Sequence, residues 1–214
     1  MIYILMYSIH ALELITIIIG IYHYKKYKNT LLKYFLFFII YGLFTELAGI
    51  IMGRVFKFPN YIVFNIYSVA YYIFNFWLFG RHFKLKNNRS VSHIFMALTT
   101  LMFILDTLFF QNIFEGYQSY TWFIGSIGTI IIVILFLIEL LNSEAILNVK
   151  HLLIFWVAVG VFLFQLGLSP VLIATKYINY SNGLTYGYIL LILNFITSLC
   201  YSLGFIWTKK NLSY

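Results

Sequence analysis

The chain has 214 residues, of which 63% are hydrophobic, 21% are aromatic and only 9% are charged. Soluble domains carry about 25% charged residues, so this composition excludes an ordinary soluble domain and indicates a polytopic membrane protein. The formal net charge is +8. Most basic residues flank apolar segments, so we interpret the charge as a topology signal and expect no nucleic-acid partner.

Seven apolar segments are long enough to cross a bilayer as helices. Membrane helices need about 20 apolar residues, whereas the strands of membrane barrels alternate over about 10 residues. The predicted spans are Ile2–Tyr22, Tyr34–Gly53, Tyr61–Gly80, Val91–Phe110, Tyr120–Leu141, Leu152–Ile173 and Thr185–Trp207. We therefore predict an all-α bundle that forms a single transmembrane domain over residues 1–214, without a soluble domain. The first span is expected to be retained rather than cleaved as a signal peptide.

The basic residues predict an orientation. Eleven Lys and Arg residues fall in one set of alternate connections and three in the other. By the positive-inside rule, the N-terminus lies outside and the C-terminus lies in the cytoplasm. The segments T-E-L-A-G (45–49) and F-Q-L-G (164–167) occupy similar places in the second and sixth spans. This similarity suggests parallel repeats in a 3+1+3 arrangement, as some transporters have.

Acidic residues inside the spans are the main functional signal. A charged side chain in the membrane costs about 3 kcal/mol, so such residues face other helices and often mark function. Glu46 follows Gly42 and precedes Gly49 on one helix face, which predicts close contact with another helix. His10 and Glu13 lie one turn apart on the first span. Asp106 and Glu139 are near span ends, where a structural role is favoured.

The polar residues of different spans are predicted to lie at similar depths in the outer half of the membrane. With a rise of 1.5 Å per residue, these residues lie about 6–16 Å below the outer surface. They are Glu46, Glu13, His10, Asn65, Gln165 and Asn194. We predict that they line a ligand pocket facing the periplasm. The alternative is that the amides only make hydrogen bonds between helices, each worth about 0.6–2 kcal/mol. The polar stripe of the third span continues from Asn65 through Ser68 and Tyr72 to Asn75.

Other chemistries have little support in the sequence. Apart from His10, the histidines lie at or near span ends, and Cys200 is the single cysteine. We therefore predict no metal site, no cofactor and no internal disulfide. No HExxH, GxSxG or Gly-rich phosphate motif occurs, so an enzyme is not favoured.

Three segments resemble uncharacterised seven-span membrane proteins of Bacteroidetes-type bacteria. They are Y-G-L-F-T-E-L-A-G (41–49), N-I-Y (65–67) and H-L-L-I-F-W-V-A-V-G-V-F-L-F-Q-L-G-L-S-P (151–170). The resemblance implies a location in the bacterial inner membrane and no particular activity. The family pattern has an acid shortly after N-I-Y, where this chain has Ala70. This departure argues against a site built on paired acids from the second and third spans.

The sequence leaves three functions open. The first is a ligand sensor or the membrane subunit of a larger assembly, in contact with the bilayer and with a protein partner or a second copy of the chain. The second is a transporter for a small solute or an ion. The third is a structural or effector membrane protein that has no ligand and uses its polar stripes for assembly.

Overall fold

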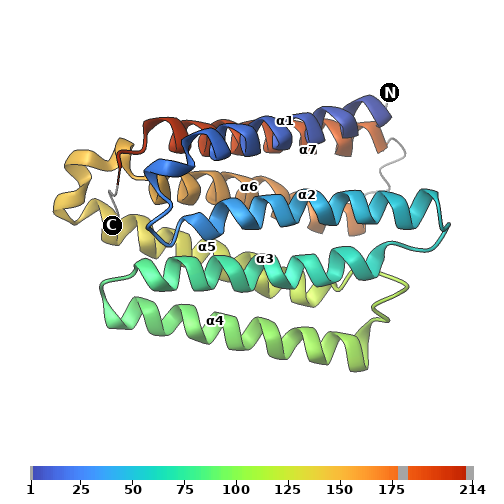
Figure 1. Cartoon of the computed structure of the whole chain (residues 1–214). Helices are drawn as coiled ribbons and strands as arrows, with labels where there is room; N and C mark the ends of the chain where they lie inside the picture. The colour runs from blue at the N-terminus through green and yellow to red at the C-terminus, as the bar shows by residue number, and fades with distance from the viewer. Residues whose placement is uncertain (1, 178–182, 211–214) are drawn as a thin grey trace. The chain divides into compact units, whose positions relative to one another are not determined.

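The computed structural model describes residues 2–177 and 183–210, and these residues form helices and connections without a β-strand (Figure 1). The long helices are α1 (Ile2–His23), α2 (Lys33–Arg54), α3 (Tyr61–His82), α4 (Lys86–Leu105), α5 (Ser119–Leu141), α6 (Leu153–Tyr177) and α7 (Gly183–Trp207). Among the described residues, seven helices are long and apolar enough to cross a membrane. The prediction of an all-α bundle with seven spans is confirmed.

The helices fall into two compact units. The first unit contains residues 1–40 and 140–214, and the second contains residues 41–139. Helices α2 and α5 each contribute residues to both units. The 3+1+3 repeat, the membrane orientation and the single domain stay predictions.

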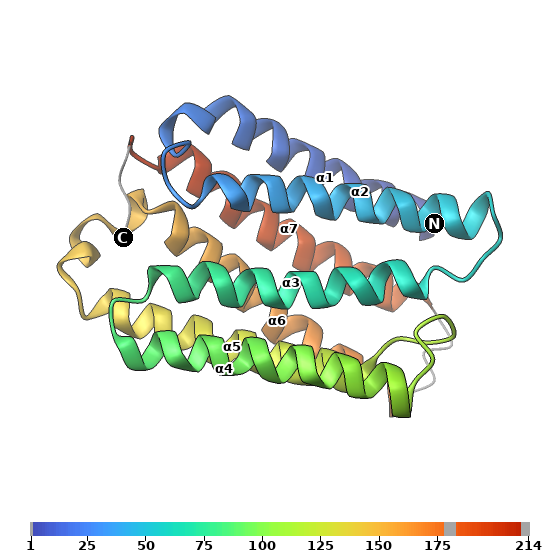
Figure 2. The same ribbon diagram turned by 60° about the horizontal axis from the view of Figure 1, so that its bottom comes forward.

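In the first unit, α7 packs against both α1 and α6, and Figures 1 and 2 show α1 beside α7. Small residues bring these helices close together. A Cβ atom built on Gly160 of α6 would lie 2.6 Å from the Tyr201 ring of α7. A Cβ atom on Gly187 of α7 would lie 2.9 Å from Leu5 of α1. Because lipid provides no hydrophobic drive between helices, such close packing is what holds this unit together.

Tyr27 closes one end of the first unit. It follows the short helix η1 (Tyr24–Lys26) and is only 1% exposed. Its hydroxyl donates to the Gly20 carbonyl at 2.7 Å, and its ring stacks on Phe205 of α7. Burial, with a smaller contribution from Tyr24, raises the pKa of the Tyr27 phenol above its ordinary value. The phenol therefore stays protonated and keeps donating this hydrogen bond at neutral pH.

In the second unit, α3 and α4 lie side by side, as both ribbon views show. The Ser92 hydroxyl of α4 donates to the Phe76 carbonyl of α3. A Cβ atom built on Gly80 would lie 2.8 Å from the same hydroxyl oxygen. Glycine at this position therefore allows the close approach that the hydrogen bond requires.

The observed helices differ from the predicted spans mainly in α4. This helix begins at Lys86 rather than Val91, because its first turn is polar and a hydropathy pattern does not include it. Its end is the π-helical segment η2 (Asp106–Phe110), where the Gln111 amide bonds to the Asp106 carbonyl five residues earlier. A further short helix, η3 (Glu144–His151), lies in the connection before α6.

Candidate functional site

Glu139, near the end of α5, has a structural role in the second unit. Its Oε1 accepts hydrogen bonds from the backbone amides of Lys84 and Leu85 at 2.6 and 3.3 Å, and its Oε2 accepts one from Asn88 at 2.8 Å. Leu85 is the residue that caps the N-terminus of α4. A carboxylate at this position satisfies free amides and matches the positive end of the helix dipole.

Asp106 accepts hydrogen bonds at the start of α5, as Glu139 does at the start of α4. Its Oδ2 accepts hydrogen bonds from the backbone amide and the hydroxyl of Thr121, at 3.1 and 3.0 Å. Thr121 lies in the first turn of α5, and both residues are fully buried. Gln118, just before this helix, donates to Thr107. The sequence interpretation did not identify Thr121 or Gln118, although a polar residue directly before an apolar run is a signal of a helix start.

The polar stripe of α3 is buried, and its two asparagines make hydrogen bonds within the second unit. Asn65 donates to the carbonyls of Ile113 and Gly116, at 3.0 and 2.8 Å, and accepts from the Gln118 amide at 3.2 Å. Asn75 donates to the Tyr71 carbonyl of its own helix. The Asn65 side chain therefore fixes the connection between α4 and α5. Its role in ligand binding stays a prediction.

Glu46 lies on α2 in the second unit and is half-buried. The glycines one turn before and after it contact α3, as predicted. A Cβ atom built on Gly42 would lie 2.9 Å from the Tyr67 hydroxyl, and one on Gly49 would lie 2.7 Å from the Phe64 ring. The glycine face of α2 therefore lies against aromatic side chains of α3, while a close approach of the two helices stays a prediction. The role of Glu46 in ligand binding stays a prediction.

His10 and Glu13 lie close together, as their spacing of three residues along one helix allows. They lie near the middle of α1, with His10 Nδ1 at 3.9 Å from Glu13 Oε2. The two side chains are 16% and 20% exposed. Glu13 Oε2 is buried and has no hydrogen-bond partner among the described residues. A separation of 3.9 Å is too long for a hydrogen bond, so His10 does not compensate for the desolvation of this oxygen.

Two further predicted ligand residues, Gln165 and Asn194, belong to the first unit, which also contains His10 and Glu13. Gln165 is buried on α6, and its backbone carbonyl accepts a hydrogen bond from the Ser169 hydroxyl at 2.6 Å. The Asn194 amide on α7 donates to the Leu190 carbonyl of its own helix at 2.9 Å. Asn194 Nδ2 therefore has a partner within its own helix, while its carbonyl oxygen remains an acceptor. Neither residue is tied to the His10–Glu13 pair by these bonds.

The fold and its apolar helices define the class of the protein, which is a multi-pass integral membrane protein. Comparisons with protein-family models, with curated proteins and with solved structures found no match to this chain.

Proposed function

We propose that this membrane protein binds a small ligand with a positively charged group at the His10–Glu13 pair, and that it acts as a sensor or as the membrane subunit of a larger assembly. The observation that supports the proposal is the buried oxygen of Glu13 without a hydrogen bond, in the middle of α1. Buried polar atoms of native proteins nearly always have partners, so an exception needs an explanation.

The chemistry of the pair favours a cationic group. The pair combines a carboxyl group, whose oxygens accept hydrogen bonds, with an imidazole ring. An ammonium or similar group would supply both the missing counter-charge and the missing hydrogen bonds. With the predicted orientation, α1 starts at the outer surface, so the ligand would enter from the periplasm of a bacterial inner membrane.

The connections between the helices support the role of a sensor or a subunit. In the described residues, the longest connection is the segment 106–118 between α4 and α5, which begins with η2, and no described connection forms a soluble domain. We infer that the response to the ligand passes to another protein chain. We propose a protein partner in the same membrane for this role.

Thermal unfolding in nanodiscs tests the binding step. The probes are tetramethylammonium, ethanolamine, spermidine and arginine, with Na⁺ and K⁺ as simple cations. A ligand at about 100 times its Kd stabilises the folded state by about 2.7 kcal/mol, which is measurable as a rise in Tm. We expect at least one probe to raise the Tm of the wild-type protein and to have no effect on Glu13→Gln.

Glu144→Gln is the matched control, because Glu144 is an exposed carboxylate of the same unit. It should respond to the probe as the wild type does. An equal response of Glu13→Gln, or no response of the wild type to any probe, would contradict the proposal. Uptake of the binding probe into proteoliposomes would favour the transporter, which is the competing function.

A further inference from the structure

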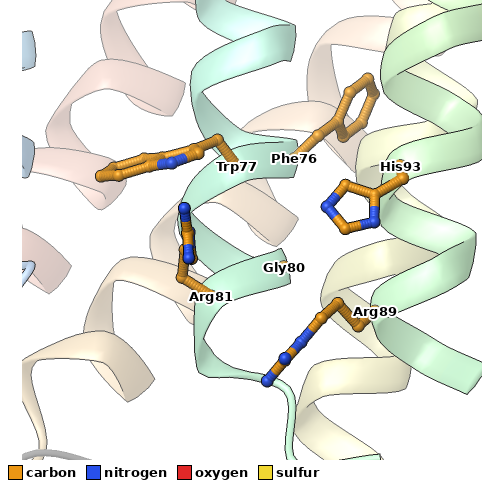
Figure 3. Close-up of a pocket in the computed structure, with 6 residues that line it drawn as sticks. All are labelled: Phe76, Trp77, Gly80, Arg81, Arg89 and His93. Carbon is orange, nitrogen blue, oxygen red and sulfur yellow. The ribbon is translucent and has the colours of Figure 1, made fainter. Parts of the chain in front are cut away.

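A basic pocket lies between α3 and α4 in the second unit (Figure 3). Its volume is about 230 Å³. It is lined by Phe76, Trp77, Gly80, Arg81, Arg89 and His93. Drug-sized ligands occupy sites of about 300–1,000 Å³, so this pocket suits a smaller group. We propose that it binds the phosphate group of an anionic phospholipid.

The two helices present cationic and hydrogen-bonding groups around Gly80. Figure 3 shows the His93 ring extending from α4 toward α3, and the Arg81 guanidinium turned along α3 toward Trp77. Arg89 comes from the first turns of α4, one turn before His93. A guanidinium carries several donors in a planar fork that matches phosphate oxygens, and it stays charged at all physiological pH values.

Neither arginine is neutralised within the described residues. In the part of the chain that the structure describes, neither guanidinium forms an ion pair with a carboxylate within 4.0 Å. The nearby carboxylate of Glu139 is occupied by the three donors of the turn between α3 and α4. Arg89 makes one hydrogen bond, from Nη2 to the Phe83 carbonyl at 2.8 Å, which leaves its other donors available. The pocket therefore keeps an excess of positive charge.

The surface next to the pocket favours a lipid over a free phosphate ion. The outer face of α4 continues from His93 as an exposed apolar stripe. Its residues are Ile94, Leu98, Leu101 and Ile104, which are between 44% and 55% exposed. Acyl chains can lie along such a stripe while the phosphate occupies the pocket at the helix end. Basic pockets between membrane helices are typical sites for anionic lipid headgroups.

Titration with phosphatidylglycerol tests the proposal. The protein is purified in phosphatidylcholine nanodiscs, phosphatidylglycerol is added, and native mass spectrometry gives the apparent Kd of the first bound molecule. Each basic residue near a membrane surface contributes about 1 kcal/mol, so we expect Arg81→Gln to raise this Kd about fivefold. The double variant Arg81→Gln/Arg89→Gln should raise it by about 25-fold if the two contributions add.

Lys86→Gln is the matched control. Lys86 is exposed at the start of α4 but does not line the pocket. We expect its Kd to stay within about twofold of the wild type, because a diffuse surface charge contributes little to a specific site. An equal loss of affinity in Lys86→Gln would overturn the proposal. So would a wild-type Kd in Arg81→Gln, which removes no hydrogen bond that the structure shows.

A second experiment distinguishes a lipid phosphate from a phosphate ion in solution. Inorganic phosphate is added to the protein in pure phosphatidylcholine nanodiscs, and the Tm is measured. We expect no rise in Tm, because the acyl chains contribute to binding of the lipid. A rise that disappears in Arg81→Gln would overturn the lipid as the ligand and assign the pocket to a phosphate from solution.

Discussion

Asp106 and Glu139 lie where another helix begins, whereas Glu13 lies in the middle of α1. The first two carboxylates receive hydrogen bonds from the free amides of α5 and from those at the start of α4. The buried Oε2 of Glu13 receives none among the described residues. The Oδ1 atom of Asp106 also has no partner there, but its Oδ2 atom accepts both hydrogen bonds from Thr121. The free amides of a helix N-terminus can satisfy an acid in a membrane protein, but the amides in the middle of a helix are already bonded to its own carbonyls. Asp106 and Glu139 therefore stabilise helix starts, whereas Glu13 caps no helix and is the acid at which we propose a ligand site.

The largest expected effect follows from removing Asp106. In Asp106→Leu, the buried amide and hydroxyl of Thr121 lose their acceptor. Each unsatisfied donor costs about 1–3 kcal/mol, so we expect the free energy of unfolding to fall by about 2–4 kcal/mol. Reversible unfolding in mixed micelles measures it. Asp106→Asn keeps an acceptor oxygen and should lose less. Wild-type stability of Asp106→Leu would contradict the capping role.

A smaller loss is expected for Glu139. The partners of its carboxylate belong to Lys84, Leu85 and Asn88, which are exposed or half-buried. Water can reach these donors once the carboxylate is gone, so Glu139→Leu should lower the free energy of unfolding by about 1–2 kcal/mol. The same unfolding measurement applies, with Glu144→Gln as a surface control. If Glu139→Leu lowered the free energy of unfolding by more than Asp106→Leu, burial of the hydrogen-bond partners would not explain which acid matters more.

The smallest effect on stability is expected for Glu13. Replacing a half-buried carboxylate, whose buried Oε2 has no hydrogen bond, with an apolar side chain removes a desolvation cost, so Glu13→Leu should raise the free energy of unfolding by about 1 kcal/mol. This variant should at the same time lose the probe-dependent rise in Tm. A destabilisation as large as that of Asp106→Leu would remove the distinction between the two kinds of acid.

Much of the fold could be predicted from the sequence, because apolar length is the dominant signal in a membrane protein. The predicted span Tyr34–Gly53 differs from α2 by one residue at each end. The buried stripe of α3 also follows from its spacing, since Asn65, Ser68, Tyr72 and Asn75 are all buried. The polar start of α4 could not be found by hydropathy, because Lys86 through Ser90 resemble a loop in composition.

The candidate sites were predicted in part. The spacing of His10 and Glu13 indicates their contact, because residues three apart share a helix face. The basic pocket was missed, since Arg81 and Arg89 were interpreted only as topology signals. Its formation depends on Arg89 being helical, one turn before His93, and on the contact of Gly80 with Ser92. These are features of tertiary packing, which residue spacing within one helix does not reveal.

The π-helical end of α4 has a consequence for how this protein can vary in evolution. The backbone hydrogen bond of a π turn spans five residues, whereas that of an α turn spans four, so a π turn contains one extra residue. Within η2, Leu108, Phe109 and Phe110 are between 58% and 73% exposed, while Asp106 is buried. Losing one of the three exposed residues would convert the turn to α-helix without removing the capping acid. We expect relatives of this protein to show single-residue deletions at 108–110, and to keep an acid at the position of Asp106.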